Sequence, residues 1–403
     1  MSEYTASLSP IRWPDAAKPA YDVVIIGGGG HGLSTAYHLA TRHGITNVAV
    51  VEADYIASGN TGRNTTIIRA NYGIPEAVRF YQHSLGLYQA LEAETGAAIL
   101  HQTKGIIWLA HTEMAMRTER ARCLMNTACG AQTFMRSPAE LKALVPQLDL
   151  TGGGRYPVLG GSHHVEGATA RHDRVAWAYA SGASQRGVDI LQHTPVTGLL
   201  RDGERVVGVE TPAGRIAAGV VLSAVGGRVT QVAAMAGVRL PVRTHPLHAF
   251  VTNDHAPGFP MILASTELAC YVSQTERGQM LIGAEFDSQP SYSRQSSYSA
   301  LRSYSYKITR LLPFLRDMRI LRTWAGICDI SADYSPIMGA TGVDGFLVTT
   351  GWGTWGFKAI PAGGEAMAEL IATGRPPVLI APFGLDRFRR DHVLADQGSA
   401  GTR

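Results

Sequence analysis

The chain has 403 residues, 45% of them hydrophobic, which suits a protein of two intertwined lobes with large buried cores. Its formal net charge of +4 is too small and too mixed in sign to indicate a nucleic-acid-binding protein. The sequence has no stretch of about 18 uninterrupted apolar residues and no apolar core of a signal peptide near its start, so neither a membrane span nor a secretion signal is predicted.

The cysteines are scattered along the chain without a CxxC pair: Cys123, Cys129, Cys270 and Cys328. This spacing argues against a zinc site and against a disulfide framework. We therefore expect free thiols, no bound metal and a cytoplasmic protein. Residues 1–19 are expected to form an arm before the first strand, and residues 386–403 a C-terminal tail.

The first strong pattern is a nucleotide-binding unit. Residues 21–26 are apolar and β-branched, which predicts a buried parallel strand, and a helix over 33–42 and a second strand over 47–51 are expected to follow. The motif G-x-G-x-x-G lies between the first strand and the helix, at Gly27, Gly29 and Gly32. The glycines allow the backbone to approach a pyrophosphate at the helix N-terminus, and Glu52 can accept hydrogen bonds from ribose hydroxyls. The pattern predicts a site for an ADP moiety, but it does not distinguish NAD from FAD.

A polar, glycine-containing loop follows Glu52 in the segment "IASGNTGRNTTIIRANYG". Such a loop could wrap a phosphate and reach the second half of a dinucleotide, or it could be a solvated turn. The candidate cofactor contacts in the first part of the chain and at one later position are Gly27, Gly29, Gly30, His31, Gly32, Glu52, Asn60, Thr61, Arg63, Thr65, Thr66, Ile68 and Val196.

The remaining segments alternate between helical and strand patterns. Helical patterns occur over 75–94, 137–145, 173–187 and 365–371, and strand patterns over 102–109, 219–224 and 346–350. Asp173 suits the N-cap of the third of these helices, and Gly374 with Pro376 suits the end of the last. Residues 240–325 alternate apolar and polar side chains, as antiparallel strands do.

These patterns predict an α/β fold with two interleaved domains. A Rossmann-like dinucleotide-binding domain is expected from residues 20–90, 155–240 and 325–385. A substrate domain built on an antiparallel sheet is expected from residues 91–154 and 241–324.

Four segments together indicate a family: "VVIIGGGGHGLSTAYHLA", "ASGNTGRN", "IIRANYG" and "GWGTWGFKAIPAGG". They resemble the D-amino-acid oxidase/sarcosine oxidase superfamily of FAD amine oxidases. "ATARHDRVAWAYA" and the C-terminal block are similar, more narrowly, to the beta-subunit family of heterotetrameric sarcosine oxidases. The resemblance implies a Rossmann-like FAD-binding domain and oxidation of sarcosine, N-methylglycine, at a non-covalent FAD. "GWGTWGFK" lacks the nearby cysteine through which single-subunit sarcosine oxidases tether FAD, which agrees with the multisubunit family.

The same resemblance implies a second flavin and several partners. Electrons would pass to an FMN held covalently by a histidine at the interface with an alpha subunit, and O2 would be reduced there to hydrogen peroxide. His172 aligns with that histidine, and a neutral imidazole is a suitable nucleophile. Alpha, gamma and delta subunits would complete the heterotetramer. Tetrahydrofolate bound to the alpha subunit would convert the formaldehyde, released beside glycine, into 5,10-methylenetetrahydrofolate.

The substrate of this family is a small zwitterion that must be held by its carboxylate. Arg69 and Lys358 stand where the family has its carboxylate-binding pair; Arg69 offers a planar fork and Lys358 a point charge. Two cations would also favour the neutral amine, so no dedicated carboxylate base is expected. Tyr72 is a further pocket candidate. Backbone contacts to the flavin are expected at Gly353, Thr354 and Gly356, with Lys358 beside them.

Two other histidines and two other functions remain as alternatives. His163 and His164 precede His172, and we expect both to be bystanders rather than metal ligands, because no cysteine or carboxylate cluster accompanies them.

The chain could instead be a dehydrogenase for sarcosine or dimethylglycine, or an oxidase of a proline-type amino acid. The second alternative function is a flavin-carrying subunit without turnover, which the presence of both cations argues against.

Overall fold

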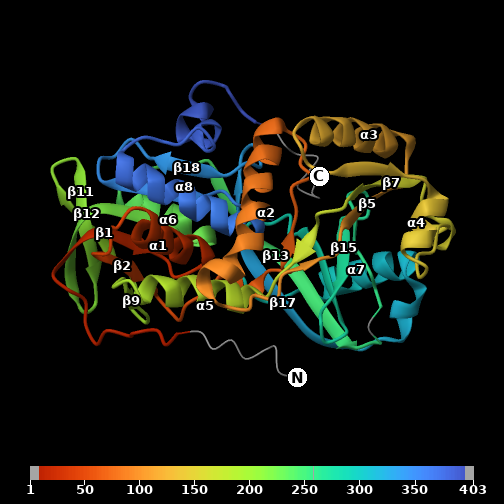
Figure 1. Ribbon diagram of the computed structural model, residues 1–403, viewed down its shortest axis with the longest axis horizontal. Helices are drawn as coiled ribbons and strands as arrows, with labels where there is room; N and C mark the ends of the chain where they lie inside the picture. Colours follow the sequence, from red (N-terminus) through yellow and green to blue (C-terminus); the bar gives the residue numbers. More distant parts are fainter. Residues whose placement is uncertain (1–8, 257, 395–403) are drawn as a thin grey trace.

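The computed structural model describes residues 9–256 and 258–394, so part of the predicted N-terminal arm (1–8) and of the C-terminal tail (395–403) lies outside the described residues. Two lobes lie side by side, and helix α2 (Pro75–Thr95) runs between them (Figure 1). Most strands belong to one of two large sheets, and a small third sheet joins the remaining short strands.

The first sheet carries the nucleotide-binding unit. In spatial order its main path is β10 (Gly198–Asp202), β11 (Arg205–Thr211), β12 (Gly214–Ser223), β1 (Ala20–Ile26), β2 (Val48–Val51) and β9 (Asp189–Leu191), with β19 (Phe346–Thr350) beside β12 and β18 (Ile337–Ala340) beside β19. β1 runs parallel to both β2 and β12. Val23 and Ile25 of β1 belong to one buried cluster, whereas Val24 and Ile26 belong to another. Both faces of β1 are therefore covered, which explains its unbroken apolar sequence.

Helices cover the two faces of this sheet. On one face α1 (Gly30–Arg42) packs between α5 (His172–Ser184) and α8 (Ile360–Thr373), and α6 (Val229–Met235) packs on the other (Figure 1). The predicted end of α8 is confirmed, because Gly374 caps it with φ of 71°. The predicted N-cap of α5 is wrong: the cap is Arg171, and Asp173 lies in the first turn and pairs with Arg171 at 2.6 Å.

The second sheet is mainly antiparallel. Its order is β17 (Ile320–Ser331), β13 (Val242–Asp254), β16 (Gln279–Phe286), β15 (Cys270–Gln274), β14 (Ile262–Ser265), β5 (Ile106–Ala110), β7 (Gly160–His164) and β6 (Thr133–Arg136). Helices α4 (Pro138–Leu144) and α7 (Tyr298–Leu311) pack into its core, and α3 (Glu113–Ala128) packs on β5, β6 and β7. Two strands differ from the expected domain boundaries. β7 lies within 155–240 and β17 crosses residue 325, yet both pair here; the "GGSHH" of β7 has no apolar alternation to reveal it.

Short elements complete the fold. β3 (Ile67–Ile68), β8 (Ala168–Thr169) and β4 (Gln102–Thr103) form the third sheet. The strand expected over 102–109 is interrupted at Gly105, whose φ of 73° separates β4 from β5. The short 3-10 helices are η1 (Asn60–Arg63), η2 (Gly152–Gly154), η3 (Gly226–Arg228), η4 (Pro313–Asp317), η5 (Phe357–Ala359), η6 (Ala381–Phe383) and η7 (Leu385–Phe388). In the described ranges, no helix combines the length and apolar character needed to cross a membrane.

Candidate functional site

A cavity of about 720 Å³ is lined by residues of both large sheets, a size typical of a cofactor or ligand site. Most of the predicted cofactor positions line it: Gly27, Gly29, Gly30, His31, Glu52, Asn60, Thr61, Arg63, Thr65, Thr66, Val196, Gly353, Thr354, Gly356 and Lys358. Arg69 lines it as well. Four predicted site residues are not among the lining residues: Gly32, Ile68, Tyr72 and His172.

The three motif glycines have different roles. Gly27 has φ of +112°, and a Cβ there would lie 2.6 Å from the carbonyl oxygen of Ala224. A Cβ on Gly32 would lie 2.0 Å from the carbonyl oxygen of Gly27, so Gly32 allows α1 to pack against the turn rather than facing the cavity. Gly29 is the N-cap of α1, and a Cβ there would meet only the Thr61 hydroxyl, at 3.3 Å. Its backbone therefore borders open space at the positive end of α1.

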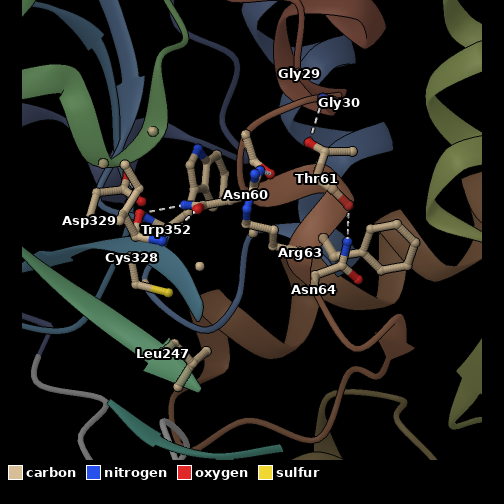
Figure 2. A pocket seen from close by; sticks show the side chains of 18 of the residues that line it. Gly29, Gly30, Asn60, Thr61, Arg63, Asn64, Leu247, Cys328, Asp329 and Trp352 are labelled. Atoms are coloured by element: carbon tan, nitrogen blue, oxygen red, sulfur yellow. Dashed lines mark hydrogen bonds between the residues drawn. The ribbon is translucent and has the colours of Figure 1, made fainter. Parts of the chain in front are cut away.

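Side chains hold in place the nucleotide-binding turn between β1 and α1, which is called the nucleotide cradle below. The Glu52 carboxylate accepts hydrogen bonds from the backbone N–H groups of Gly28 (2.8 Å) and Asp54 (2.9 Å), which fixes it at the end of β2 and against the cavity. The Thr61 hydroxyl accepts from the N–H of Gly30 at 2.9 Å (Figure 2). Thr61 thereby joins the polar loop to the first turn of α1.

The polar loop is tied to the second sheet. The Asn60 side chain accepts from the N–H of Ile327 (2.8 Å) and donates to its carbonyl (2.6 Å), as a neighbouring strand would. The Trp324 indole donates to the carbonyl of Arg63 at 2.7 Å. The Thr65 hydroxyl donates to that of Tyr271 at 2.9 Å. The alternative of a solvated turn is therefore wrong, because this loop forms a wall of the cavity with strand β17.

The glycine-rich turn after β19 also lines the cavity. Gly351 and Gly353 have φ of 71° and 51°, which glycine adopts without strain. The imidazole of His31 stacks on Trp352 with ring centres 4.2 Å apart, and its Nε2 lies 2.9 Å from the carbonyl oxygen of Gly356. Burial lowers the pKa of His31 to about 4, so the ring is neutral and Nε2–H donates to that carbonyl. His31 thus joins the start of α1 to the turn.

Asp329 is a residue of this site that the sequence analysis missed. It lies in β17 at the cavity wall, and its carboxylate accepts hydrogen bonds from Thr350, Gly351 and Trp352 of the glycine-rich turn. The only sequence signal is one acid within the apolar run "AGICDIS". Its neighbour Cys328 also lines the cavity (Figure 2).

The two predicted cations are both buried and both line the cavity. The Arg69 guanidinium donates to the carbonyl of Asn71 at 2.7 Å and lies 4.2 Å from the Tyr72 ring centre and 5.1 Å from that of Trp108. Lys358 Nζ donates to the carbonyl of Thr354 at 3.1 Å. Burial, and next the charge of Arg69, lower the pKa of Lys358 well below 10.5. The cations are close enough to repel each other, and an anion between them would relieve that repulsion.

Tyr72 and His172 do not line the cavity. Tyr72 is fully buried and stacks on Tyr81 with ring centres 4.1 Å apart, so it supports Arg69 from behind. His172 is the first residue of α5 and is partly buried. Its Nδ1 is buried and has no hydrogen-bond partner among the described residues, and burial lowers its pKa. A neutral imidazole with an uncommitted nitrogen fits a covalent attachment point.

Among residues 9–256 and 258–394, no group of three or more histidine, cysteine, aspartate or glutamate side chains is arranged to hold a metal ion. His163 and His164 follow each other on β7 and do not line the cavity.

A nucleotide cradle that continues to two buried cations beneath a glycine-rich turn is the arrangement of a flavin-dependent amine or amino acid oxidoreductase. This chain belongs to the FAD dependent oxidoreductase family, whose model matches residues 22–370. Within that family it groups with sarcosine oxidase beta subunits, as the resemblance predicted. It is 41% identical to the Rhodobacter capsulatus subunit over 384 residues, covering 95% of this chain and 92% of that protein.

A second beta subunit, from Rhizobium meliloti, is 42% identical over 390 residues, covering 96% of this chain and 92% of that protein. Among solved structures, L-proline dehydrogenase from P. horikoshii superposes with a TM-score of 0.88 at 28% identity. It covers 93% of this chain and 99% of the other. These relatives confirm the predicted fold class and the predicted FAD-dependent amine oxidoreductase.

Proposed function

We propose that this chain is the catalytic beta subunit of a multisubunit sarcosine oxidase, and that it oxidatively demethylates sarcosine. The observation that carries the proposal is the pair Arg69 and Lys358, both buried and both lining the cavity that the nucleotide cradle opens into. Its support is the 41% and 42% identity to beta subunits over nearly their whole length.

The residues of the cradle are suited to hold FAD. The open backbone at Gly29 would receive the pyrophosphate, the Glu52 carboxylate would receive the ribose, and the turn at Gly353 to Gly356 would border the flavin ring. Bound FAD would supply the acceptor of the electrons released when the substrate's N-methyl carbon is oxidised.

The chain's own residues bind and orient the substrate. Arg69 and Lys358 would hold the carboxylate of sarcosine, so that its N-methyl end is the part left to face the flavin site. The same positive charges disfavour the protonated amine, which must lose its proton before oxidation. Trp108 and Tyr271 also line the cavity, and their rings would limit the space beside the substrate.

The second flavin and the partner subunits belong to the same proposal. The uncommitted Nδ1 of His172 would hold an FMN. The chemistry supplied by this group when bound would be the reduction of O2 to hydrogen peroxide with the two electrons taken from sarcosine. Alpha, gamma and delta subunits would surround the FMN, with the tetrahydrofolate site on alpha. Glycine and formaldehyde, or 5,10-methylenetetrahydrofolate, would be the products. The free cysteines Cys123, Cys129, Cys270 and Cys328 suit a cytoplasmic location.

Anaerobic titration of the purified, FAD-loaded protein with sarcosine tests the function. We expect the flavin absorbance near its visible maximum to bleach with sarcosine, and to bleach far less with dimethylglycine or L-proline. Hydrogen peroxide should form when air is admitted. A flavin that L-proline reduces and sarcosine does not would overturn the proposal in favour of a proline-type enzyme, and one that neither reduces would indicate a carrier subunit.

A further inference from the structure

His164 is a fully buried side chain that touches the segment carrying Arg69 without lining the cavity. It is the last residue of β7, in the second sheet. Its Nε2 lies 3.3 Å from the backbone nitrogen of Ala70, the residue next to Arg69. Its Nδ1 lies 3.1 Å from the carbonyl oxygen of Gln132 and 3.3 Å from the Thr133 hydroxyl.

These contacts assign one protonation state to the ring. Burial is the main cause that lowers the pKa of His164 to about 4, and the positive charge of Arg69 adds to it. The imidazole is therefore neutral near neutral pH and carries a single proton. A proton on Nδ1 satisfies the Gln132 carbonyl and leaves Nε2 as an acceptor for the N–H of Ala70. The opposite tautomer would leave two donors facing each other at Ala70.

The other end of the segment is held from helix α3. The Asn126 amide donates to the carbonyl of Tyr72 at 2.8 Å and to that of Arg122 at 2.7 Å. Within the segment, the N–H of Tyr72 donates to the carbonyl of Ala70 at 3.1 Å. Side chains from β7 and α3 thus hold the backbone of residues 69–72, and the short strand β3 comes directly before this segment.

Arg69 depends on this backbone for its direction. Its guanidinium donates to the carbonyl of Asn71 at 2.7 Å and to the Asn71 side-chain oxygen at 3.2 Å, so the fork turns with the segment that carries it. A shift of Ala70 would move both the base of the Arg69 side chain and the groups that hold its tip.

We propose that His164 is a positioning residue for substrate recognition, which holds Ala70 so that the Arg69 fork faces the cavity. This inference rests on the proposed function, in which Arg69 binds the substrate's carboxylate. His164 contacts neither substrate nor flavin in this role, and it exchanges no proton.

The test compares three variants of the FAD-loaded protein, purified in the assembly in which it is expressed. His164→Leu removes both ring nitrogens, whereas His164→Gln can restore an acceptor for Ala70. His163→Leu is the matched control, because His163 is the adjacent residue of β7 and its ring lies against Gly105, away from residues 69–72. Acetate binding, read as a flavin absorbance change, and sarcosine kinetics are measured for each.

We expect His164→Leu to raise the acetate Kd and the sarcosine KM about tenfold, the effect of losing one buried hydrogen bond, with a much smaller change in kcat. His164→Gln should recover most of the affinity, and its pH profile should match the wild type because His164 does not titrate there. Amide hydrogen exchange in the peptide holding residues 69–72 should speed up in His164→Leu alone.

A failure of the proposed function can be distinguished from a failure of the positioning role of His164. Wild-type protein that binds no acetate and is not reduced by sarcosine would overturn the proposed function, whatever the variants do. Wild-type binding that His164→Leu retains in full, with unchanged exchange in residues 69–72, would overturn the positioning role while leaving the proposed function intact. Equal losses in His163→Leu and His164→Leu would also overturn it, since they would reflect a general weakening of β7.

Discussion

The carboxylate of Asp329 accepts a hydrogen bond from the backbone N–H of Gly351 at 2.7 Å, which joins the second sheet to the glycine-rich turn of the first. The same oxygen accepts from the Thr350 hydroxyl at 2.8 Å and from the N–H of Trp352 at 3.3 Å. The N–H of Gly353 donates to the backbone carbonyl of Asp329 at 3.0 Å. One buried residue of β17 therefore sets the shape of the turn expected to border the flavin.

Asp329→Ala should loosen this turn. It would leave the three donors without their acceptor in a buried place, and we expect the free energy of unfolding to fall by about 2–4 kcal/mol. FAD should also dissociate more readily. Denaturant unfolding and flavin release during gel filtration measure the two effects. Asp329→Asn is the control, because its amide oxygen can still accept; equal stability of the alanine and asparagine variants would contradict this role.

Gly29 and Gly32 provide a matched pair within one motif. Gly32→Ala would put a methyl group 2.0 Å from the carbonyl oxygen of Gly27, so we expect an overpacking cost of about 1–3 kcal/mol in unfolding free energy. A methyl group at Gly29 would meet only the Thr61 hydroxyl, at 3.3 Å, which needs to move by a few tenths of an ångström. For Gly29→Ala we therefore expect a smaller loss of stability of the flavin-free protein than for Gly32→Ala, but weaker FAD binding. Thermal unfolding and FAD titration of the apoprotein separate the two. If Gly29→Ala lost stability and Gly32→Ala did not, the roles assigned to the two glycines, cofactor approach and helix packing, would be reversed.

The nucleotide cradle was the most predictable part of the molecule. The apolar run of β1 and the spacing from Gly27 to Glu52 are local properties, because a buried strand and a helix N-terminus each need particular residue types at fixed intervals. The predicted positions from Gly27 to Thr66 line the cavity for that reason, with Gly32 the exception, since its role is to let α1 pack closely.

The parts that the sequence did not reveal depend on contacts between distant segments. Asp329 reaches the turn at Gly351, and Asn60 pairs with Ile327, across more than one element of the chain. No periodicity marks such pairs, because each residue alone looks like an ordinary polar side chain. β7 was missed for a related reason: "GGSHH" is buried on both faces through glycine, small and ring side chains rather than aliphatic ones.

Lys358→Met tests the carboxylate anchor directly. The substitution keeps a side chain of similar length and removes the charge, so we expect acetate binding to weaken by about 1.5–3 kcal/mol, the value of a hydrogen bond to a charged group. Arg69→Lys should also weaken binding, because a point charge cannot replace the bidentate fork. Flavin absorbance titration with acetate measures both. Unchanged affinity in Lys358→Met would remove this residue from the site.

His172 is expected to hold a flavin that denaturation does not release. After acid precipitation and proteolysis, the yellow colour should remain with the peptide that contains His172, because a bond to its imidazole survives unfolding. His172→Ala should release all of its flavin on precipitation, while FAD content per chain should stay as in the wild type. Mass spectrometry of the peptide gives the added mass. Complete release of flavin from the wild-type protein would contradict the attachment.

The pH dependence of carboxylate binding should follow the buried state of Lys358. Burial and the charge of Arg69 lower the pKa of Lys358 well below 10.5, so above that lowered pKa the free protein holds a neutral amine. A bound carboxylate favours the ammonium form, so binding takes up a proton and the acetate Kd should rise by up to about tenfold per pH unit there.

The stability of the fold should increase over the same pH range in which acetate binding weakens. Between the lowered pKa and 10.5 the unfolded chain binds more protons at this lysine than the folded chain does, so its contribution to the unfolding free energy rises with pH. Lys358→Met removes both dependences, whereas Lys358→Arg keeps a permanent charge and should bind acetate without this slope. Acetate titrations between about pH 7 and pH 10 measure the slope of binding, and denaturant unfolding over the same range measures the slope of stability. A wild-type slope that persists in Lys358→Met would show that another group titrates.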